Sequence, residues 1–280
     1  MTIRKIILYL CLVVMLGMMI FFSYKSYVHA KIYEETTAVL VHQMDAKKLA
    51  AFKLHELAEK FSFGFYTNDK KETIEILKSS GKLHKNQSQK YMLYAIVMLF
   101  AILGSYFLLS LRAFTFFGAV SAMVLLIFGL ITPIMMVTIH KEVEYLGDVV
   151  LSFESKAIIG SIVKLYNHGD IVVALVILLF SVLIPLVKTF SLAFVSVFMK
   201  STFAHGMVKF FKAIGKWSMV DVFVVATFLV YLTVDKGDVS RAQVEVGLYF
   251  FLAYVIVSML VSLSADKMLH QQKEGDEKEK

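Results

Sequence analysis

Long apolar runs alternate with shorter polar segments along the chain. Six of these runs reach the length of about 20 residues that a helix needs to cross the hydrocarbon core of a bilayer. The pattern predicts an all-α polytopic integral membrane protein with six transmembrane helices: residues 6–24, 91–111, 115–139, 171–199, 218–234 and 246–264. The first run has the basic start of a signal peptide but no small-residue cleavage site, which favours an uncleaved anchor.

The composition agrees with a membrane protein. Of the 280 residues, 58% are hydrophobic and only 18% are charged, whereas a soluble domain is nearer one half apolar and one quarter charged. The single cysteine, Cys11, leaves no means of building a disulfide or a cysteine-based zinc site within one chain.

Charges in the short connections predict the orientation. The connection between residues 199 and 217 carries four lysines and no acid, which is typical of a cytoplasmic loop. The connection at residues 141–170 is net acidic, and so is the one between the last two spans. We therefore expect both termini in the cytoplasm.

Three regions follow from this topology. Residues 1–111 form a hairpin of two membrane helices that carries a helical periplasmic insert at about residues 25–90. Residues 112–269 form a membrane module of four helices. Residues 270–280 are strongly charged and predict a disordered cytoplasmic tail.

Two amphipathic stretches have the pattern of helices that lie on a membrane surface. Residues 152–170 place Ile158, Ile159, Ile162, Val163 and Tyr166 on one helical face. On the cytoplasmic side, residues 201–216 have an apolar stripe and a basic face of Lys209, Lys212 and Lys216. The alternative for both is a short loop helix packed on its own bundle.

Prolines and charges inside the apolar runs are the candidates for chemistry. Pro133 and Pro185 both fall within predicted spans, where a proline kinks a helix and frees a carbonyl group. Lys188 follows Pro185 by three residues. It either snorkels to the inner interface or faces a polar interior, with Asp221 as the available counter-charge.

Asp221 has two interpretations of its own. It lies one turn past Trp217, in a helix that Ser218 caps well, so it could simply stabilise the helix start through the dipole. It is nevertheless past the capping position, and the turn that follows is wholly apolar. An ion pair with Lys188 would offset the burial of both groups.

No enzyme signature is present, so we expect neither catalysis nor a cofactor. His140 and His168 lack the spacing of a metal site, and no phosphate-binding glycine loop occurs. Nucleic acid is not an expected partner, because the basic residues lie at membrane edges rather than in a groove with stacking aromatics.

The stretch "GKWSMVDVF", residues 215–223, resembles the most diagnostic motif of the paraquat-inducible protein A family. "LITPIMMV" is similar to the proline near the end of that family's first module helix, and "SVLIPLVK" to its Ser-x-x-x-Pro-x-x-Lys helix. The resemblance covers one module. The zinc ribbons and second module that many members carry are replaced here by the N-terminal hairpin.

The resemblance implies a protein of the bacterial inner membrane that takes part in lipid transport between membranes and in envelope integrity. It implies an MCE-domain periplasmic protein as partner, phospholipid as cargo, and a homodimer as one way to supply a second module. By position, Pro185, Lys188, Trp217, Ser218 and Asp221 would belong to a polar transport network. The alternatives are a membrane-anchored periplasmic sensor or scaffold, and an ion-coupled small-molecule transporter.

Overall fold

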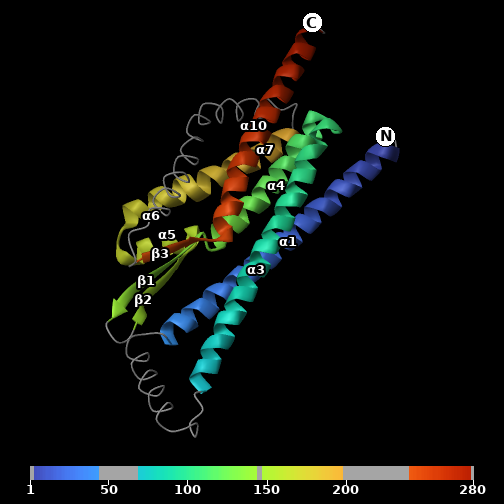
Figure 1. The fold of residues 1–280 in the computed structure, drawn as a ribbon. Coiled ribbons are helices and arrows are strands. Elements are labelled where there is room, and N and C mark those ends of the chain that lie inside the picture. The colour runs from blue at the N-terminus through green and yellow to red at the C-terminus, as the bar shows by residue number, and fades with distance from the viewer. Residues whose placement is uncertain (1–2, 44–68, 144–146, 198–239, 279–280) are drawn as a thin grey trace, which may run out of the picture.

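The protein is described here by a computed structural model that covers residues 3–43, 69–143, 147–197 and 240–278. Within these ranges the chain is mainly helical, and five helices are long and apolar enough to cross a membrane. The predicted class of multi-pass helical membrane protein is confirmed. A small sheet lies at one end of the module, and the start of the first helix and the end of the last helix both lie towards the other end (Figure 1).

The N-terminal hairpin consists of α1, Ile3–Gln43, and α3, Asp69–Gly104. A short 3-10 turn, Ser105–Phe107, follows α3. With 41 residues, α1 is about 60 Å long, twice the thickness of the hydrocarbon core. The predicted insert at residues 25–90 is therefore, where described, a straight continuation of the two membrane helices, with no break at either boundary.

The hairpin packs through small and polar residues. Ser26 and Ser88 are buried and exchange hydrogen bonds, each hydroxyl donating to the other's carbonyl at 2.9 Å. Ala30 and Ala95 are also buried. Small side chains let two helices approach closely, which is how helices associate in a membrane where burial of apolar surface gains little.

The centre of the module is the antiparallel pair α4, Leu111–Ile131, and α10, Val246–Lys278. Their closest approaches are at glycines: a Cβ on Gly118 would lie 2.6 Å from Val261, and one on Gly129 would lie 2.8 Å from the backbone nitrogen of Phe251. The core of buried Leu, Val and Phe side chains surrounds this pair.

A three-stranded antiparallel sheet in the order β2-β1-β3 closes this end of the module. Its strands are β1, Met135–Val143, β2, Gly147–Lys156, and β3, Ser240–Val244. No strand was expected at these residues, and the third span was predicted to reach residue 139. Helix α4 ends at Ile131 instead. The residue before a proline favours an extended backbone, and Thr132 adopts one, with ψ of 145°. Pro133 thus ends a helix and does not kink one.

The chain then passes through α5, Ile158–His168, and an interrupted span. That span comprises α6, Ile171–Ile177, a π-helical segment Leu178–Leu183, and α7, Ile184–Val197. Gly169, with φ of 91°, ends α5 in the left-handed conformation that glycine adopts without strain. The predicted surface helix is therefore present, but it starts six residues later than expected because β2 occupies residues 147–156.

The C-terminal end of the chain differs from the prediction. Residues 270–280 were predicted to be a disordered tail, but helix α10 continues to Lys278, so most of this segment is helical. The predicted span 218–234 lies outside the described residues. The flanking residues Val197 and Ser240 lie at opposite ends of the module, since Val197 contacts Arg112 and Ser240 pairs with Ile139. The count of six spans stays a prediction.

Candidate functional site

The polar interior of the module is built around the interrupted span. Proline has no backbone N–H, so Pro185 cannot complete the regular hydrogen-bond ladder. The π segment immediately before it changes the ladder, and the N–H of Ile184 donates to the carbonyl of Leu179, five residues back. Single-turn π segments of this kind are frequent at functional sites.

The carbonyl group of Pro185 accepts polar contacts from two helices. The Thr189 hydroxyl donates to it at 2.8 Å from the next turn of α7, and the Tyr254 hydroxyl of α10 approaches it at 3.5 Å. Tyr254 is 1% exposed. The first turn of α7 is thus attached to α10 by a buried polar contact as well as by apolar packing.

Lys188 lies one turn beyond Pro185 and is only 8% exposed. A lysine that snorkelled to the membrane surface would extend its ammonium group out of the bundle, so this burial contradicts the snorkelling alternative. A buried ammonium group requires compensating polar contacts.

Hydroxyl groups on the facing surfaces of α4 and α10 extend the polar interior. Thr115 and Ser264 are buried and 3.2 Å apart. The register that brings Thr115 to Ser264 places Ser121 opposite Ser258. Both of these serine hydroxyls are buried, and within the described part of the chain neither has a hydrogen-bond partner. Such groups are available to a water molecule or to a polar part of a ligand.

Arg112 lies at the C-terminal end of α7 and binds its carbonyl groups. Its guanidinium donates from Nε to the carbonyl of Ser196 and from Nη2 to that of Val197, both at 2.7 Å. These are the last carbonyls of α7, where a positive charge also complements the helix dipole. An open cavity of about 480 Å³ lies beside Arg112, with Tyr9 and Phe116 among its lining residues.

A second polar link joins the hairpin to the module at the sheet. Lys85 of α3 lies 3.3 Å from the carboxylate of Glu245, which is 4% exposed, and donates to the Gln243 side chain at 2.7 Å. Burial raises the pKa of Glu245, and the neighbouring Lys85 partly opposes that shift. This ion pair was not predicted, because no hydrophobic or charge pattern in the sequence connects residue 85 with residue 245.

The predicted site residues are therefore placed only in part. Pro185 and Lys188 are buried in the module, and their role in a transport network stays a prediction. Trp217, Ser218 and Asp221 lie outside the described residues, as do the basic residues Lys209, Lys212 and Lys216, so the Lys188–Asp221 ion pair stays a prediction. The hydroxyl groups of Thr115, Ser121, Ser258 and Ser264 were missed, although their recurrence at spacings of six residues within apolar spans was visible in the sequence.

Comparison with known proteins identifies this module. The model of the paraquat-inducible protein A family matches residues 112–273, which is 162 of 280 residues. The "Intermembrane transport protein PqiA" of Escherichia coli K12 is 27% identical over 128 residues, covering 44% of this chain and 30% of the relative. The "Probable intermembrane transport protein" of Haemophilus influenzae is 25% identical over 118 residues, covering 40% and 28%.

No solved structure matches the chain. The matched part spans less than one third of the length of these curated relatives. The match begins at Arg112, the residue that caps α7, and contains the buried Lys188, the interrupted span and the α4–α10 core. The chain belongs to the paraquat-inducible protein A family, with a single module preceded by a helical hairpin.

Proposed function

We propose that the protein is an inner-membrane component of a system that moves lipid, or a similar amphipathic cargo, between membranes and maintains the cell envelope. The relatives are named as intermembrane transport proteins. The observation that supports the proposal is the buried polar interior of the family module, where Lys188 lies on the proline-containing span, one turn after its π-helical segment.

In this mechanism the chain's own residues supply a polar path through an apolar bundle. The π segment and Pro185 weaken the helix at the level of Lys188, which allows the two halves of the span to change their relative angle. The ammonium group offers a site for an anionic headgroup or for the Asp221 carboxylate. Ser121 and Ser258 offer further polar contacts at the α4–α10 interface.

The partner that we propose is an MCE-domain periplasmic protein that docks on the sheet side of the membrane and exchanges phospholipid with the module. A second copy of the chain would supply the second module that longer relatives have room for. The test is co-purification from a native membrane, with mass spectrometry of bound protein and lipid. Recovery of the folded chain with neither phospholipid nor an MCE-domain protein would contradict this assignment.

A double-mutant cycle tests the polar interior directly. Lys188→Met and Asp221→Asn should each impair detergent resistance of the host cell and reduce bound phospholipid. Breaking a buried pair leaves one charge uncompensated, at a cost of about 3–5 kcal/mol, whereas removing both charges is often neutral. The double variant should therefore be more stable than either single variant. The control is Lys267→Gln, which changes an exposed side chain of α10 and should leave both properties unaltered. Full envelope function in folded single variants would exclude a role in transport.

A scaffold or sensor is the second candidate, and the length of the hairpin favours it. Helices α1 and α3 extend well past the membrane boundary at residues 25 and 90 and would hold a partner away from the bilayer. Shortening both helices by matched turns beyond the membrane distinguishes the two functions. A transporter should keep part of its activity, whereas a sensor should lose all of it.

A further inference from the structure

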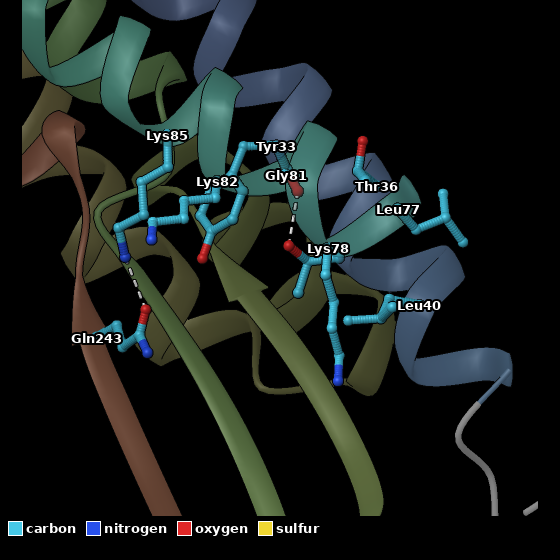
Figure 2. A pocket seen from close by; sticks show the side chains of 10 residues that line it. Tyr33, Thr36, Leu40, Leu77, Lys78, Gly81, Lys82, Lys85 and Gln243 are labelled. Carbon is cyan, nitrogen blue, oxygen red and sulfur yellow. Dashed lines mark hydrogen bonds between the residues drawn. The ribbon is translucent and has the colours of Figure 1, made fainter. Parts of the chain in front are cut away.

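A basic pocket lies on the hairpin, and all of its described lining residues except Gln243 lie outside the part of the chain that matches the family. It is formed between α1 and α3, with Gln243 of β3 closing one end, as Figure 2 shows. Its volume is about 310 Å³, at the lower end of the range of small-ligand sites. Among the residues that the structure describes, its wall contains three lysines, Lys78, Lys82 and Lys85, and no acidic residue.

The three lysines lie on one stripe of α3, because positions i, i+4 and i+7 share a helical face. Like charges at this spacing repel one another. Lys85 is compensated by Glu245 and bound to Gln243. Within the described residues, no salt bridge involves Lys78 or Lys82. With three cations against one carboxylate, the pocket keeps a net charge of about +2 and favours an anion.

The rest of the wall suits an amphipathic anion better than a free one. Leu40 and Leu77 are apolar, and the Tyr33 ring lies 5.2 Å beneath the Lys85 ammonium group. The hydroxyl groups of Thr36 and Thr37 donate to carbonyls of their own helix at 2.7 Å. The charged donors that remain for an anion are therefore the ammonium groups, and Figure 2 shows Lys78 extending past Leu40 along this wall.

The height of the pocket relative to the membrane also points to a lipid. The apolar part of α3 begins at Tyr91. At 1.5 Å per residue, Lys85 lies about 9 Å and Lys78 about 20 Å beyond that residue. The headgroup layer is only about 5–8 Å thick. The pocket thus begins next to the headgroups and leads away from the bilayer.

We propose that this pocket binds the phosphate headgroup of an anionic phospholipid, such as phosphatidylglycerol, after it has left the outer face of the membrane. The anion site itself does not depend on the proposed transport role; the choice of a lipid as its source does. Figure 2 shows Lys82 extending towards Lys85 and Lys78 extending past Leu40. The headgroup phosphate lies against Lys82, and Lys78 attracts it through its charge from further along the wall. Leu40, Leu77 and the Tyr33 ring contact the glycerol and the first carbons of the acyl chains.

The test measures binding of short-chain dihexanoyl phosphatidylglycerol to the full-length protein in nonionic detergent by isothermal titration calorimetry. Dihexanoyl phosphatidylcholine and glycerol 3-phosphate are the comparison ligands. Phosphatidylglycerol should bind about tenfold more tightly than either, and salt should weaken its binding. Equal affinity for glycerol 3-phosphate would overturn the assignment to a lipid, and equal affinity for phosphatidylcholine would overturn the role of charge.

Matched variants locate the site. Lys78→Gln with Lys82→Gln should weaken phosphatidylglycerol binding about tenfold, whereas Lys78→Arg with Lys82→Arg should retain it. Lys90→Gln with Lys267→Gln removes the same charge elsewhere and should leave affinity unchanged. If the control pair weakens binding as much as the pocket pair, the pocket is not the site. The outcome is independent of Lys188, because a Lys188→Met protein without transport activity should still bind phosphatidylglycerol here.

Discussion

The two helix pairs of the molecule are held together in different ways. In the α4–α10 pair, glycines bring backbones together: a Cβ at Gly129 would meet the Phe251 backbone, and one at Gly247 would lie 2.4 Å from the carbonyl oxygen of Thr132. The α1–α3 pair also buries apolar side chains such as Met19 and Ile102, but it adds polar contacts between its helices, such as Ser26 with Ser88 and His29 with His84. A Cβ at Gly81 would make only ordinary contacts, at 3.7 Å or more.

We call the module, with its α4–α10 backbone contacts, the steric frame, and we call the α1–α3 hairpin the adjustable arm. Backbone-to-backbone packing leaves no side chain that can move to relieve a change, so the module should behave as one body. Contacts through hydroxyl, imidazole and ammonium groups respond to protonation and salt. We therefore expect pH and salt to change the stability of the hairpin more than that of the module.

The largest effect is expected in the module, at Gly247. Gly247→Ala should destabilise the protein by at least about 3 kcal/mol or prevent folding, because the new Cβ would overlap the carbonyl oxygens of Thr132 and Pro133. Thermal unfolding followed by circular dichroism in detergent measures this loss. Gly17→Ala is the matched control, since nothing lies within 4 Å of that Cβ. Equal stability of the two variants would disprove the steric frame.

Arg112→Ala should have the next largest effect, a loss of about 2 kcal/mol. It removes two charge-assisted hydrogen bonds to the last carbonyls of α7. Arg112→Lys keeps the charge but not the forked geometry, so it should recover only part of the loss. Complete recovery in the lysine variant would mean that charge alone stabilises this end of the span.

Acidification should loosen the hairpin by about 1 kcal/mol. The two Nδ1 atoms of His29 and His84 are 2.8 Å apart, and a hydrogen bond between them requires one to accept. Burial, with smaller contributions from His84 and Lys25, lowers the pKa of His29. A histidine with a lowered folded-state pKa binds its proton less readily in the folded protein, so stability falls as the pH falls from the ordinary value of 6.5 towards the lowered one. The melting temperature should fall between pH 7.5 and 5.5 in the wild type. His84→Gln should flatten this dependence, and His42→Gln, which changes an exposed residue, should leave it unchanged.

The smallest effect is expected at the sheet surface. The hydrogen bond from Lys164 lowers the pKa of Glu154. A carboxyl with a lowered folded-state pKa contributes stability above its ordinary pKa, and the contribution is lost as the pH falls through the folded-state value. Both side chains are about half exposed, so Lys164→Ala should cost at most about 0.5 kcal/mol at pH 7 and less at pH 4. A larger loss in urea unfolding would show that this surface pair is coupled to the frame.

Much of the helical plan was predictable from the sequence. Runs of apolar residues located the five described spans, and the Gly169 stop and the amphipathic spacing located α5. The family motifs pointed to Pro185 and Lys188, and both lie in the module interior. The errors cluster at polar segments near the membrane boundary. Strand β1 was missed because its apolar start, residues 135–139, was assigned to the third span, which also hid its hairpin with β2. Strand β3 was missed because it pairs with β1 across about one hundred residues, and such pairing leaves no local signal.

The sequence by itself determined that this is a membrane protein, where its described spans lie and which family it belongs to. Span length, exclusion of charge from hydrocarbon and a short family motif are local properties, and each can be read without knowing what packs on what. Only the tertiary structure decided that Lys188 is buried, that Lys85 meets Glu245, and that three lysines line a pocket between α1 and α3. Such juxtapositions depend on the register and depth of packing between helices far apart in the chain, which apolar periodicity does not specify.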